Sequence, residues 1–504
     1  MIFGFLPQNL KTQAVAVAFS IAWTGGEVEP RAEDGARARN RLAGFRGELY
    51  RCLTARADAL FEACDAVLCK QDRVHMLAEL SLEPECRRGH GGVYDAVNAG
   101  RVRISRLRRA LAALPLPCWD DGRIRLAADV SNWLRPDAVT SPERLFCHCH
   151  ARGRGDAQMI PGWPYSVIAA LEPGRTSWTL PLDAVRLGPA DDATAVTAAQ
   201  VREVVTRIRD AGHWRDGDPP VLVVFDAGYD LTRLAWLLRD IPVEVLGRLR
   251  SDRVLYFPAA PRPPGVAGRP CRHGPAFKLA DEQAQPAAQV TACHATRYGT
   301  VRVSAWGRLH QKLTARAGWA GHHGDLPVIE GTLIQLHAID HPPGYRHLES
   351  MWLWSSRPDA RPGQVTVLWQ AYLRRFDLEH TFRFLKQVLG WTRPKLRDPA
   401  AADRWTWLIL SCYAQLRLAR PLAADLRLPW QQPAPPGRLT PARVRRGFRN
   451  IRATLPCPAS APKPGKPGPG RPPGSKNRHP APRHDVGKTV KRAKTKKPAR
   501  KQPG

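Results

Sequence analysis

The stretch Tyr372–Lys386 reads YLRRFDLEHTFRFLK, and the rest of the chain can be interpreted around it. Four polar side chains share one face of the helix that this stretch predicts, because offsets of 0, 3, 7 and 14 residues fall within an arc of about 60°. These residues are Tyr372, Arg375, Glu379 and Lys386. Arg383, at offset 11, joins the same stripe.

Two interpretations of this stripe are open. One carboxylate among basic groups and a phenol suits a site that holds a metal ion beside a phosphodiester, with cations on the flanking phosphates. The alternative is a solvated helix face whose Glu–Arg and Glu–Lys pairs stabilise one another at helical spacing. The choice depends on whether the chain supplies further acids upstream.

Two upstream aspartates follow strand-like runs. Residues 123–130 read RIRLAADV and predict a short strand that ends in Asp129. Residues 221–225 read VLVVF, which predicts a strand buried on both faces that delivers Asp226 at its end. Open α/β sheets place their chemistry at the carboxyl ends of strands, so both aspartates join Glu379 as candidate metal ligands.

Each of the three acids also has a simpler interpretation. Asp129 and Asp226 suit turns, and Glu379 suits an ion pair on the helix surface. Asp137 and Asp230 compete as candidates, but both lie beyond the predicted strand ends. The combination of two strand ends with the helical stripe favours the first set.

The pattern Tyr-x2-Arg-x3-Glu-x6-Lys resembles the Tyr-Arg-Glu-Lys motif of DDE-type bacterial insertion-sequence transposases. Every offset agrees, and the resemblance spans roughly residues 120–420. It implies an α/β, ribonuclease-H-like (retroviral-integrase-like) fold with a mixed sheet. The predicted order of three strands, helix, strand, helix and strand is the order of that fold. The candidate acids stand 97 and 153 residues apart, and the longer gap implies a β-rich insertion.

The resemblance also implies an activity and a cofactor. Members of the family bind terminal inverted repeats and carry out cut-and-paste cleavage and strand transfer of DNA. The catalytic and metal-binding residues would be Asp129, Asp226 and Glu379, which would hold Mg²⁺, with Mn²⁺ as a substitute. Such ions activate the attacking oxygen and stabilise the leaving one. The implied partners are the terminal repeats and target DNA, bound by a homodimer.

Individual DNA-binding roles follow from the same resemblance. Tyr372 and Arg375 would contact the DNA end, and Lys386 would contact phosphate near the scissile bond. Arg383 is an additional candidate clamp because it shares the stripe. Trp352, on a strand-like run just before the helix, would stack on a flipped base, whereas core packing is its alternative.

The composition agrees with a polyanionic partner. The 504 residues contain 77 Lys and Arg against 45 Asp and Glu, a formal net charge of +32. This favours nucleic acid over a membrane surface. The 11 cysteines show no CxxC pairs, so neither a disulfide framework nor a zinc ribbon is indicated. Residues 147–150 read CHCH, which is too crowded for one tetrahedral zinc site.

Composition shifts divide the chain into six parts. We expect a disordered leader, a helical module that is a candidate for DNA binding, a first catalytic part, the β-rich insertion, a second catalytic part and a disordered basic tail. Their ranges are 1–35, 36–118, 119–250, 251–345, 346–428 and 429–504. The apolar part of the leader superficially suggests a signal peptide, but its basic region is weak and no cleavage site is clear.

The terminal parts leave further alternatives. The helical module is Arg-rich on its polar positions, which fits either a DNA contact or a bundle with a solvated basic face. From 458 to 504 the tail has 14 Lys and Arg and one acid, so it cannot build a core. Arg471 lies in a Gly-Arg-Pro sequence similar to an AT-hook core, and an arm that binds phosphates non-specifically is the alternative.

The predicted protein is therefore a transposase in the bacterial cytoplasm, associated with the nucleoid and without a membrane anchor. Two other functions remain: a decayed or domesticated DNA-binding protein that does not cleave, and a ribonuclease-H-like nuclease without strand transfer.

Overall fold

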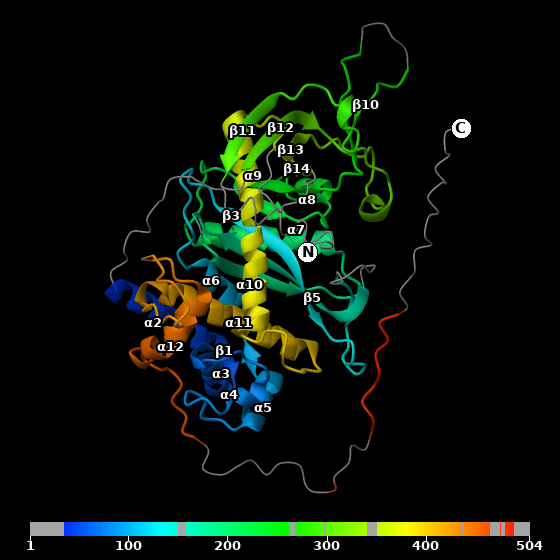
Figure 1. Cartoon of the computed structure of the whole chain (residues 1–504). Coiled ribbons are helices and arrows are strands. Elements are labelled where there is room, and N and C mark those ends of the chain that lie inside the picture. Colours follow the sequence, from blue (N-terminus) through cyan, green and yellow to red (C-terminus); the bar gives the residue numbers. More distant parts are fainter. Residues whose placement is uncertain are drawn as a thin grey trace, which may run out of the picture.

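In a computed structural model of the chain, the described residues are 35–149, 158–174, 176–262, 268–296, 299–339, 350–435, 437–463, 474 and 479–487. A large mixed sheet is flanked by helices, and a second group of helices lies at one end of it (Figure 1). The α/β class expected from the sequence is confirmed. The leader up to residue 34 and Arg471 lie outside the described residues.

The main sheet has ten strands within the described ranges. Its order is β11-β12-β13-β14-β8-β7-β3-β5-β4, and β6 also pairs with β5. The strands are β3 (Arg125–Leu134), β4 (Leu145–Cys149), β5 (Gln158–Leu171), β6 (Thr179–Arg186), β7 (Val221–Phe225), β8 (Val243–Leu249), β11 (Val290–Thr296), β12 (Gly299–Leu309), β13 (Gly331–Ala338) and β14 (Met351–Ser355).

Strand β7 is the buried centre of this sheet, as its apolar run predicts. All five of its residues are buried, and it runs parallel to both β3 and β8. Its side chains alternate between two cores. Leu222 and Val224 pack with α9 (Pro362–Arg374), whereas Val223 and Phe225 join the core that contains α7 (Ala193–Asp210) and α8 (Leu231–Leu237). Helices therefore cover both faces of the sheet at this point.

Strand β3 differs from its expected length. We expected it to end at Asp129, but it continues to Leu134 because Val130–Leu134 pair antiparallel with the long strand β5. The parallel pairing with β7, in contrast, ends at Ala128. Asp129 therefore lies within β3 but at the end of its parallel ladder.

The insertion is β-rich, and most of it extends the main sheet. Strands β11, β12 and β13 connect through β14 to the edge of β8. A separate two-stranded sheet consists of β9 (Val254–Pro258) and β10 (His273–Lys278). The described residues of the insertion also include two short 3₁₀ turns, η1 (Glu282–Ala284) and η2 (Ala317–Trp319).

The N-terminal helices form a module that shares its core with the C-terminal helices. Its elements are α2 (Gly35–Cys52), β1 (Leu53–Ala55), α3 (Ala57–Cys69), α4 (Leu77–Leu80), α5 (His90–Ala99), β2 (Arg101–Val102) and α6 (Ile104–Ala112). The long helix α11 (Pro399–Ala419), which ends in the 3₁₀ turn η3 (Arg420–Leu422), packs against α2, α3 and α5. The N-terminal and C-terminal helices of the described residues thus build one helical core.

A buried charge network joins four of these helices. The Arg46 guanidinium of α2 donates two hydrogen bonds to Asp65 of α3, at 2.6 and 2.9 Å, and one to Gln415 of α11, at 2.8 Å. Arg452 donates to Asp65 from α12 (Pro441–Ala453) at 3.1 Å. Arg46 and Asp65 are each 1% exposed. Such a pair is costly to break, because one partner would then be buried and unpaired.

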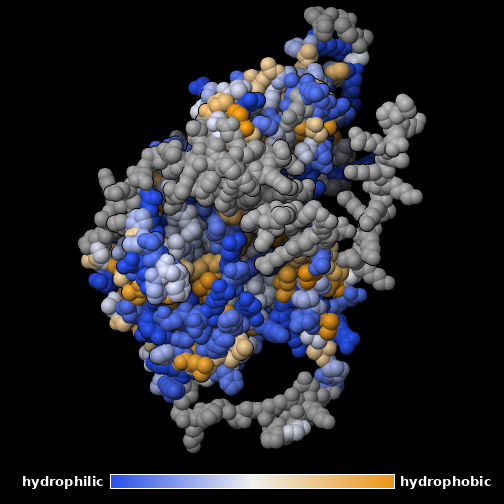
Figure 2. Space-filling view, viewed as in Figure 1, coloured by the Kyte–Doolittle hydropathy of each residue, from blue (hydrophilic) through white to orange (hydrophobic). Residues whose placement is uncertain are grey.

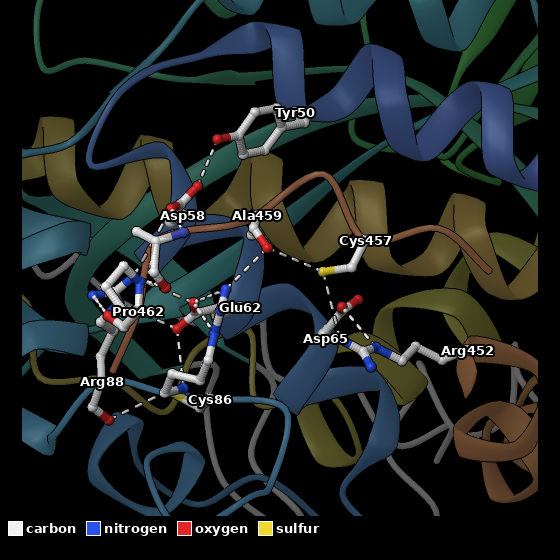
Figure 3. A network of polar contacts seen from close by, with 12 residues as sticks. Tyr50, Asp58, Glu62, Asp65, Cys86, Arg88, Arg452, Cys457, Ala459 and Pro462 are labelled. Atoms are coloured by element: carbon white, nitrogen blue, oxygen red, sulfur yellow. Dashed lines mark hydrogen bonds and ion pairs between the residues drawn. The ribbon is translucent and has the colours of Figure 1, made fainter. Parts of the chain in front are cut away.

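The expectation of an unstructured tail over 429–504 is wrong for part of this range. Helix α12 buries Val444, Phe448 and Ile451, one side of an amphipathic helix, in the helical core. After α12, residues 454–463 form an extended segment, the C-terminal strap, which runs over α3 (Figure 3). Composition pointed to disorder because this range is rich in Pro, Gly and basic residues, but the apolar residues of α12 recur at helical spacing.

Side chains of the N-terminal module bind the backbone of the C-terminal strap. Arg87 donates to the carbonyl of Ala459 at 3.0 Å, and Asp58 accepts from the amide of Ala461 at 2.8 Å. Arg88 donates to the carbonyls of Ala461 and Pro462, at 3.2 and 3.1 Å (Figure 3). The strap is therefore part of the folded structure.

Hydrophilic residues dominate the described part of the face seen in Figure 2, and hydrophobic ones form small separate groups there. Among the described residues, no helix is long and apolar enough to cross a membrane.

Candidate active site

The strand register places two aspartates next to each other. The last parallel pair between β3 and β7 is Ala128 with Phe225. Asp129 follows Ala128, and Asp226 follows Phe225. Neighbouring strands lie about 4.8 Å apart, so the two aspartates are adjacent. Asp129 has a side chain that is 19% exposed, and that of Asp226 is 35% exposed. Both carboxylates are therefore held by the sheet backbone and remain partly open to solvent.

The third acid comes from the long helical rod formed by α9 and α10 (Phe376–Gln387), which crosses the sheet (Figure 1). Glu379 lies in the first turn of α10, and its side chain is 26% exposed. Together, Asp129, Asp226 and Glu379 are called the acid cluster below. The structure brings these three predicted residues to one place from three separate elements.

Arg375 lies at the centre of the acid cluster. Its Nη1 is 3.1 Å from Oδ2 of Asp129, and its Nη2 is 2.9 Å from Oε1 of Glu379 and 3.7 Å from Oδ1 of Asp226. The Arg375 side chain is 3% exposed. The stripe of the helix thus faces a cluster of carboxylates, which excludes the alternative of a solvated face for this part of it.

Tyr372 supports the cluster from the preceding turn of α9. Its hydroxyl donates a hydrogen bond to Oδ1 of Asp226 at 3.2 Å, and the Arg375 guanidinium lies 5.8 Å from the centre of its ring. Burial and the nearby Asp226 raise the pKa of the Tyr372 phenol above its usual value, so it remains a donor. Tyr372 therefore holds the carboxylate of Asp226 in place.

The two aspartates differ in their electrostatics. Burial raises the pKa of Asp129 to about 7, and the negative charges of Asp226 and Glu379 add to this effect while Arg375 opposes it. Burial also opposes ionisation of Asp226. The positive charge of Arg375 and the hydrogen bond from the Ala227 amide, together with smaller contributions, outweigh burial and lower the pKa of Asp226. One guanidinium among three carboxylates leaves an excess of negative charge.

That excess is the property that a divalent cation requires. Hard cations such as Mg²⁺ prefer carboxylate oxygens and keep several waters, so three acids suffice. Among the described residues, no three acidic, His or Cys side chains already surround a common point in a geometry that could hold an ion. The reason is visible in the contacts: the guanidinium of Arg375 stands between the carboxylates. The three carboxylates therefore fit a divalent metal as ligands, but the guanidinium of Arg375 occupies the space between them.

The rest of the stripe extends away from the acid cluster. Lys386 Nζ donates to the carbonyl of Asn132 in β3 at 2.9 Å. Burial lowers the pKa of Lys386 to about 8. Arg383, one turn earlier, is exposed to solvent. The two cations therefore lie beyond the acids along the same helix.

The base-stacking prediction for Trp352 is not supported. The side chain is 2% exposed and packs between Trp306 and Phe277, with ring centroids 5.9 and 6.0 Å away. Strand β14 lies between β13 and β8, so its alternating side chains point into cores on both sides. Core packing is the role that this position has.

Two residues near the acids were not predicted. The backbone amide of Tyr229 donates to the carbonyl of Asp226 at 3.3 Å. Burial and the negative charges of Asp129 and Asp226 raise the pKa of the Tyr229 phenol well above its usual value. Arg248 lies next to Asp226 because Phe225 pairs with Gly247, and it helps to lower the pKa of that aspartate. Both residues come shortly after the last paired residues of β7 and β8, and this position after a buried strand is the signal that could have identified them.

Many arginines of the N-terminal module are engaged within the protein. Arg87 and Arg88 form ion pairs with Glu62, Arg106 with Glu48, and Arg108 with Asp183. The bundle interpretation is favoured for these four. Three others are exposed: Arg101, Arg103 and Arg109.

Comparison with known proteins adds one match. A family model described as DDE superfamily endonuclease matches residues 48–312. This is more than half of the 504 residues. The matched part contains Asp129 and Asp226 and ends before Glu379. No protein with a curated function matches the chain.

Proposed function

Because the chain belongs to the DDE superfamily endonucleases, we propose that it is the transposase of an insertion sequence. It binds the terminal inverted repeats of its element and catalyses metal-dependent DNA cleavage and strand transfer. The observation that carries this proposal is the convergence of the acid cluster on Arg375, with each acid 2.9 to 3.7 Å from a guanidinium nitrogen. A family of endonucleases acts on DNA, and the net charge of +32 suits that substrate.

The strand order supports a ribonuclease-H-like catalytic domain. In the order β6-β5-β3-β7-β8, the first three strands are antiparallel neighbours and the last three are parallel. The predicted order of strands and helices in that fold agrees with this arrangement. The β-rich insertion then separates β8 from the helix that delivers Glu379.

The mechanism assigns the binding of Mg²⁺ or Mn²⁺ to the acid cluster. When bound there, such ions lower the pKa of an attacking water and stabilise the leaving oxygen. The sheet and the helical rod hold the three carboxylates, and Tyr372 fixes Asp226 by its hydrogen bond. In this way the protein prepares the positions of its ligands before the substrate arrives.

The cations of the stripe bind the DNA. Arg375 and Tyr372 contact the DNA end, and Lys386 holds a phosphate near the scissile bond and stabilises charge that develops in the transition state. Arg383, exposed on the same helix, is a further phosphate contact. The basic tail that includes Arg471 adds non-specific affinity.

The setting of the reaction follows from the proposal. Two copies of the chain act on the paired ends of the element and on target DNA, in the nucleoid region of a bacterial cytoplasm. Two other functions are distinguished from this one by experiment: a nuclease that cleaves without strand transfer, and a DNA-binding protein that does not cleave.

The test uses the full chain and a labelled duplex with a terminal repeat from the DNA that flanks its coding sequence. Nicking and joining are scored separately with Mg²⁺ and with EDTA. Cleavage and joining that both disappear in Glu379→Gln support the proposal. Asp137→Asn is the matched control, because Asp137 lies outside the acid cluster and is 72% exposed.

Each other outcome contradicts the proposal in a specific way. Cleavage without joining points to a nuclease, and binding without cleavage points to a DNA-binding protein. Equal activity of Glu379→Gln and the wild-type protein would show that the acid cluster has no catalytic part.

A further inference from the structure

Arg375 makes contacts that a residue reserved for DNA would not need. Its two terminal nitrogens lie within 3.7 Å of all three members of the acid cluster. Among the described residues, its Nε has no hydrogen-bond partner. The guanidinium is thus held by carboxylates, the groups that a divalent ion would use.

The neighbouring Arg374 shows the contrast. Its Nη2 donates to the main-chain carbonyls of Glu172 and Thr176, at 3.0 and 3.3 Å, and lies 2.6 Å from Asp377. These contacts join the helical rod to the segment after β5 and make Arg374 a structural residue. Arg375, in contrast, contacts carboxylates whose side chains are 19% to 35% exposed, so its surroundings open toward solvent.

We propose that Arg375 is an internal counter-cation, which the divalent metal displaces from the acid cluster and which then becomes available to a DNA phosphate. The inference rests on the proposed function and deepens it, because it assigns a regulatory exchange to the same site. One residue thereby serves two anions in succession: the carboxylates before metal binding and a phosphate after it.

The physical reason is competition for the same oxygens. An ion bound to Asp129, Asp226 and Glu379 would lie next to the guanidinium, and two cations at such a distance repel each other strongly in a partly buried site. Arg375 lies between α9 and α10, where Arg375 N bonds to Tyr372 O and Leu378 N bonds to Arg375 O, both at 3.0 Å. Only its side chain needs to move.

The exchange makes metal binding and DNA binding dependent on each other. Metal releases Arg375 for the phosphate, and a phosphate that binds Arg375 frees the carboxylates for metal. Such coupling is reciprocal in free energy. Without DNA, Arg375 therefore weakens metal binding, which protects the cell's DNA from a loaded but unguided enzyme.

The experiment measures Mn²⁺ binding to the full chain without DNA, from the electron paramagnetic resonance signal of free Mn²⁺. The variants are Arg375→Gln, Arg375→Lys and Arg248→Gln, with Asp226→Asn to identify the site. We expect Arg375→Gln to bind Mn²⁺ more tightly than the wild-type protein, by a factor of roughly 5 to 150, the usual range of coupling between sites. Arg375→Lys keeps the charge but cannot bridge three acids, so it should also bind more tightly.

The control separates displacement from general electrostatics. Arg248 lies beside Asp226 and lowers its pKa through its charge. If Arg248→Gln tightens Mn²⁺ binding as much as Arg375→Gln does, and Arg375→Lys equals the wild-type protein, the effect is one of charge alone and the proposal is wrong. Unchanged or weaker binding in Arg375→Gln would also overturn it, since Arg375 would then organise the acids for metal.

Thermal unfolding in EDTA checks that each variant folds. If Arg375→Gln does not fold, Arg375→Lys decides the outcome. Asp226→Asn separates this inference from the proposed function. If Asp226→Asn binds Mn²⁺ like the wild-type protein, the acid cluster is not the metal site and both fail. If it loses Mn²⁺ but Arg375→Gln gains nothing, the exchange alone fails.

Discussion

Asp129 and Asp226 lie side by side because the parallel ladder between β3 and β7 ends one residue before each of them, at Ala128 and Phe225. Their relative position is a property of the sheet backbone. Glu379, in contrast, is delivered by a helix that is connected to β8 through the whole insertion. Two members of the acid cluster are therefore fixed by the pairing of adjacent strands, and the third depends on the packing of a helix across the sheet.

Binding of DNA should depend on pH through Lys386. Burial lowers its pKa to about 8, so the ammonium loses its charge as pH rises through 8. If Lys386 binds a phosphate, affinity for a labelled repeat at constant salt should fall by up to about tenfold between pH 7 and 9, because one pH unit above the pKa is worth about 1.4 kcal/mol.

The comparison variant is Lys386→Met, which should bind more weakly and show no such fall. Lys278→Met is the matched control, because Lys278 is an exposed lysine on β10. Its profile should follow the wild-type profile. A wild-type affinity that stays constant across this range would contradict the role of Lys386 at a phosphate.

A shortened tail should affect salt dependence and stability separately. A chain that ends at Lys463 keeps the C-terminal strap and loses 13 of the 14 Lys and Arg that follow residue 457. Because the contacts of the strap with the N-terminal module remain, the helical core should be unchanged. The slope of log affinity against log salt should become less steep if the tail binds phosphates. An unchanged slope would show that the tail does not contact DNA.

A chain that ends at Pro456 should behave differently. It removes the carbonyls of Ala459, Ala461 and Pro462, to which Arg87 and Arg88 donate hydrogen bonds. It also removes the backbone amide of Ala461, which donates a hydrogen bond to Asp58. Unmet polar groups of this kind cost about 1–3 kcal/mol. The free energy of unfolding, measured in urea, should therefore be lower by an amount of that order than for the chain that ends at Lys463. Equal stability of the two chains would mean that the strap contributes nothing.

How far the sequence predicts this structure depends on how local each signal is. Strand β7 was predicted because a run of five apolar residues indicates a strand that is buried on both faces, whichever strands lie beside it. The extension of β3 beyond Asp129 was missed because it depends on pairing with β5, whose position no local pattern shows. Helix α12 was missed because charge dominated its composition, although Val444, Phe448 and Ile451 carried a helical signal.

The site was predictable as a set of residues but not as an arrangement. The helical stripe placed Arg375 and Glu379 on one face, which the structure agrees with. That Arg375 would also reach Asp129 and Asp226 depends on the packing of a helix across two strands far away in the sequence. The burial of Trp352 could not be foreseen for a similar reason, since burial on a strand depends on the neighbouring strands.

Trp352→Ala tests the core-packing role of this residue. A large aromatic side chain removed from a core costs about 3–5 kcal/mol, and Trp352 packs against Trp306 and Phe277. The free energy of unfolding, measured in urea, should fall by an amount of this size relative to the wild-type protein. Affinity for the labelled repeat, measured well below the unfolding transition, should stay within twofold of the wild-type value. A large loss of affinity without a loss of stability would restore the base-stacking role.

The buried pair of Arg46 and Asp65 should be the most sensitive feature of the helical core. Arg46→Met removes two hydrogen bonds from the almost fully buried carboxylate of Asp65 and leaves it the contact with Arg452. Breaking one side of such a pair costs about 3–5 kcal/mol. Chemical unfolding measures the loss, and Arg51→Met is the control, because Arg51 pairs with Glu48 on an exposed surface. A loss no larger than that of the control would show that the network is unimportant.

The position of Glu379 after the insertion has a consequence for the timing of synthesis. A ribosome that has just made Asp226 must add 153 more residues before it reaches Glu379. At about 5–20 residues per second, this takes roughly 8–30 seconds. Until the last few residues of that interval, the nascent chain has two of its three acids and neither Arg375 nor Lys386. A protein truncated by a premature stop anywhere in this interval would be unable to assemble the acid cluster, so incomplete products of translation would lack the site that we propose to be catalytic.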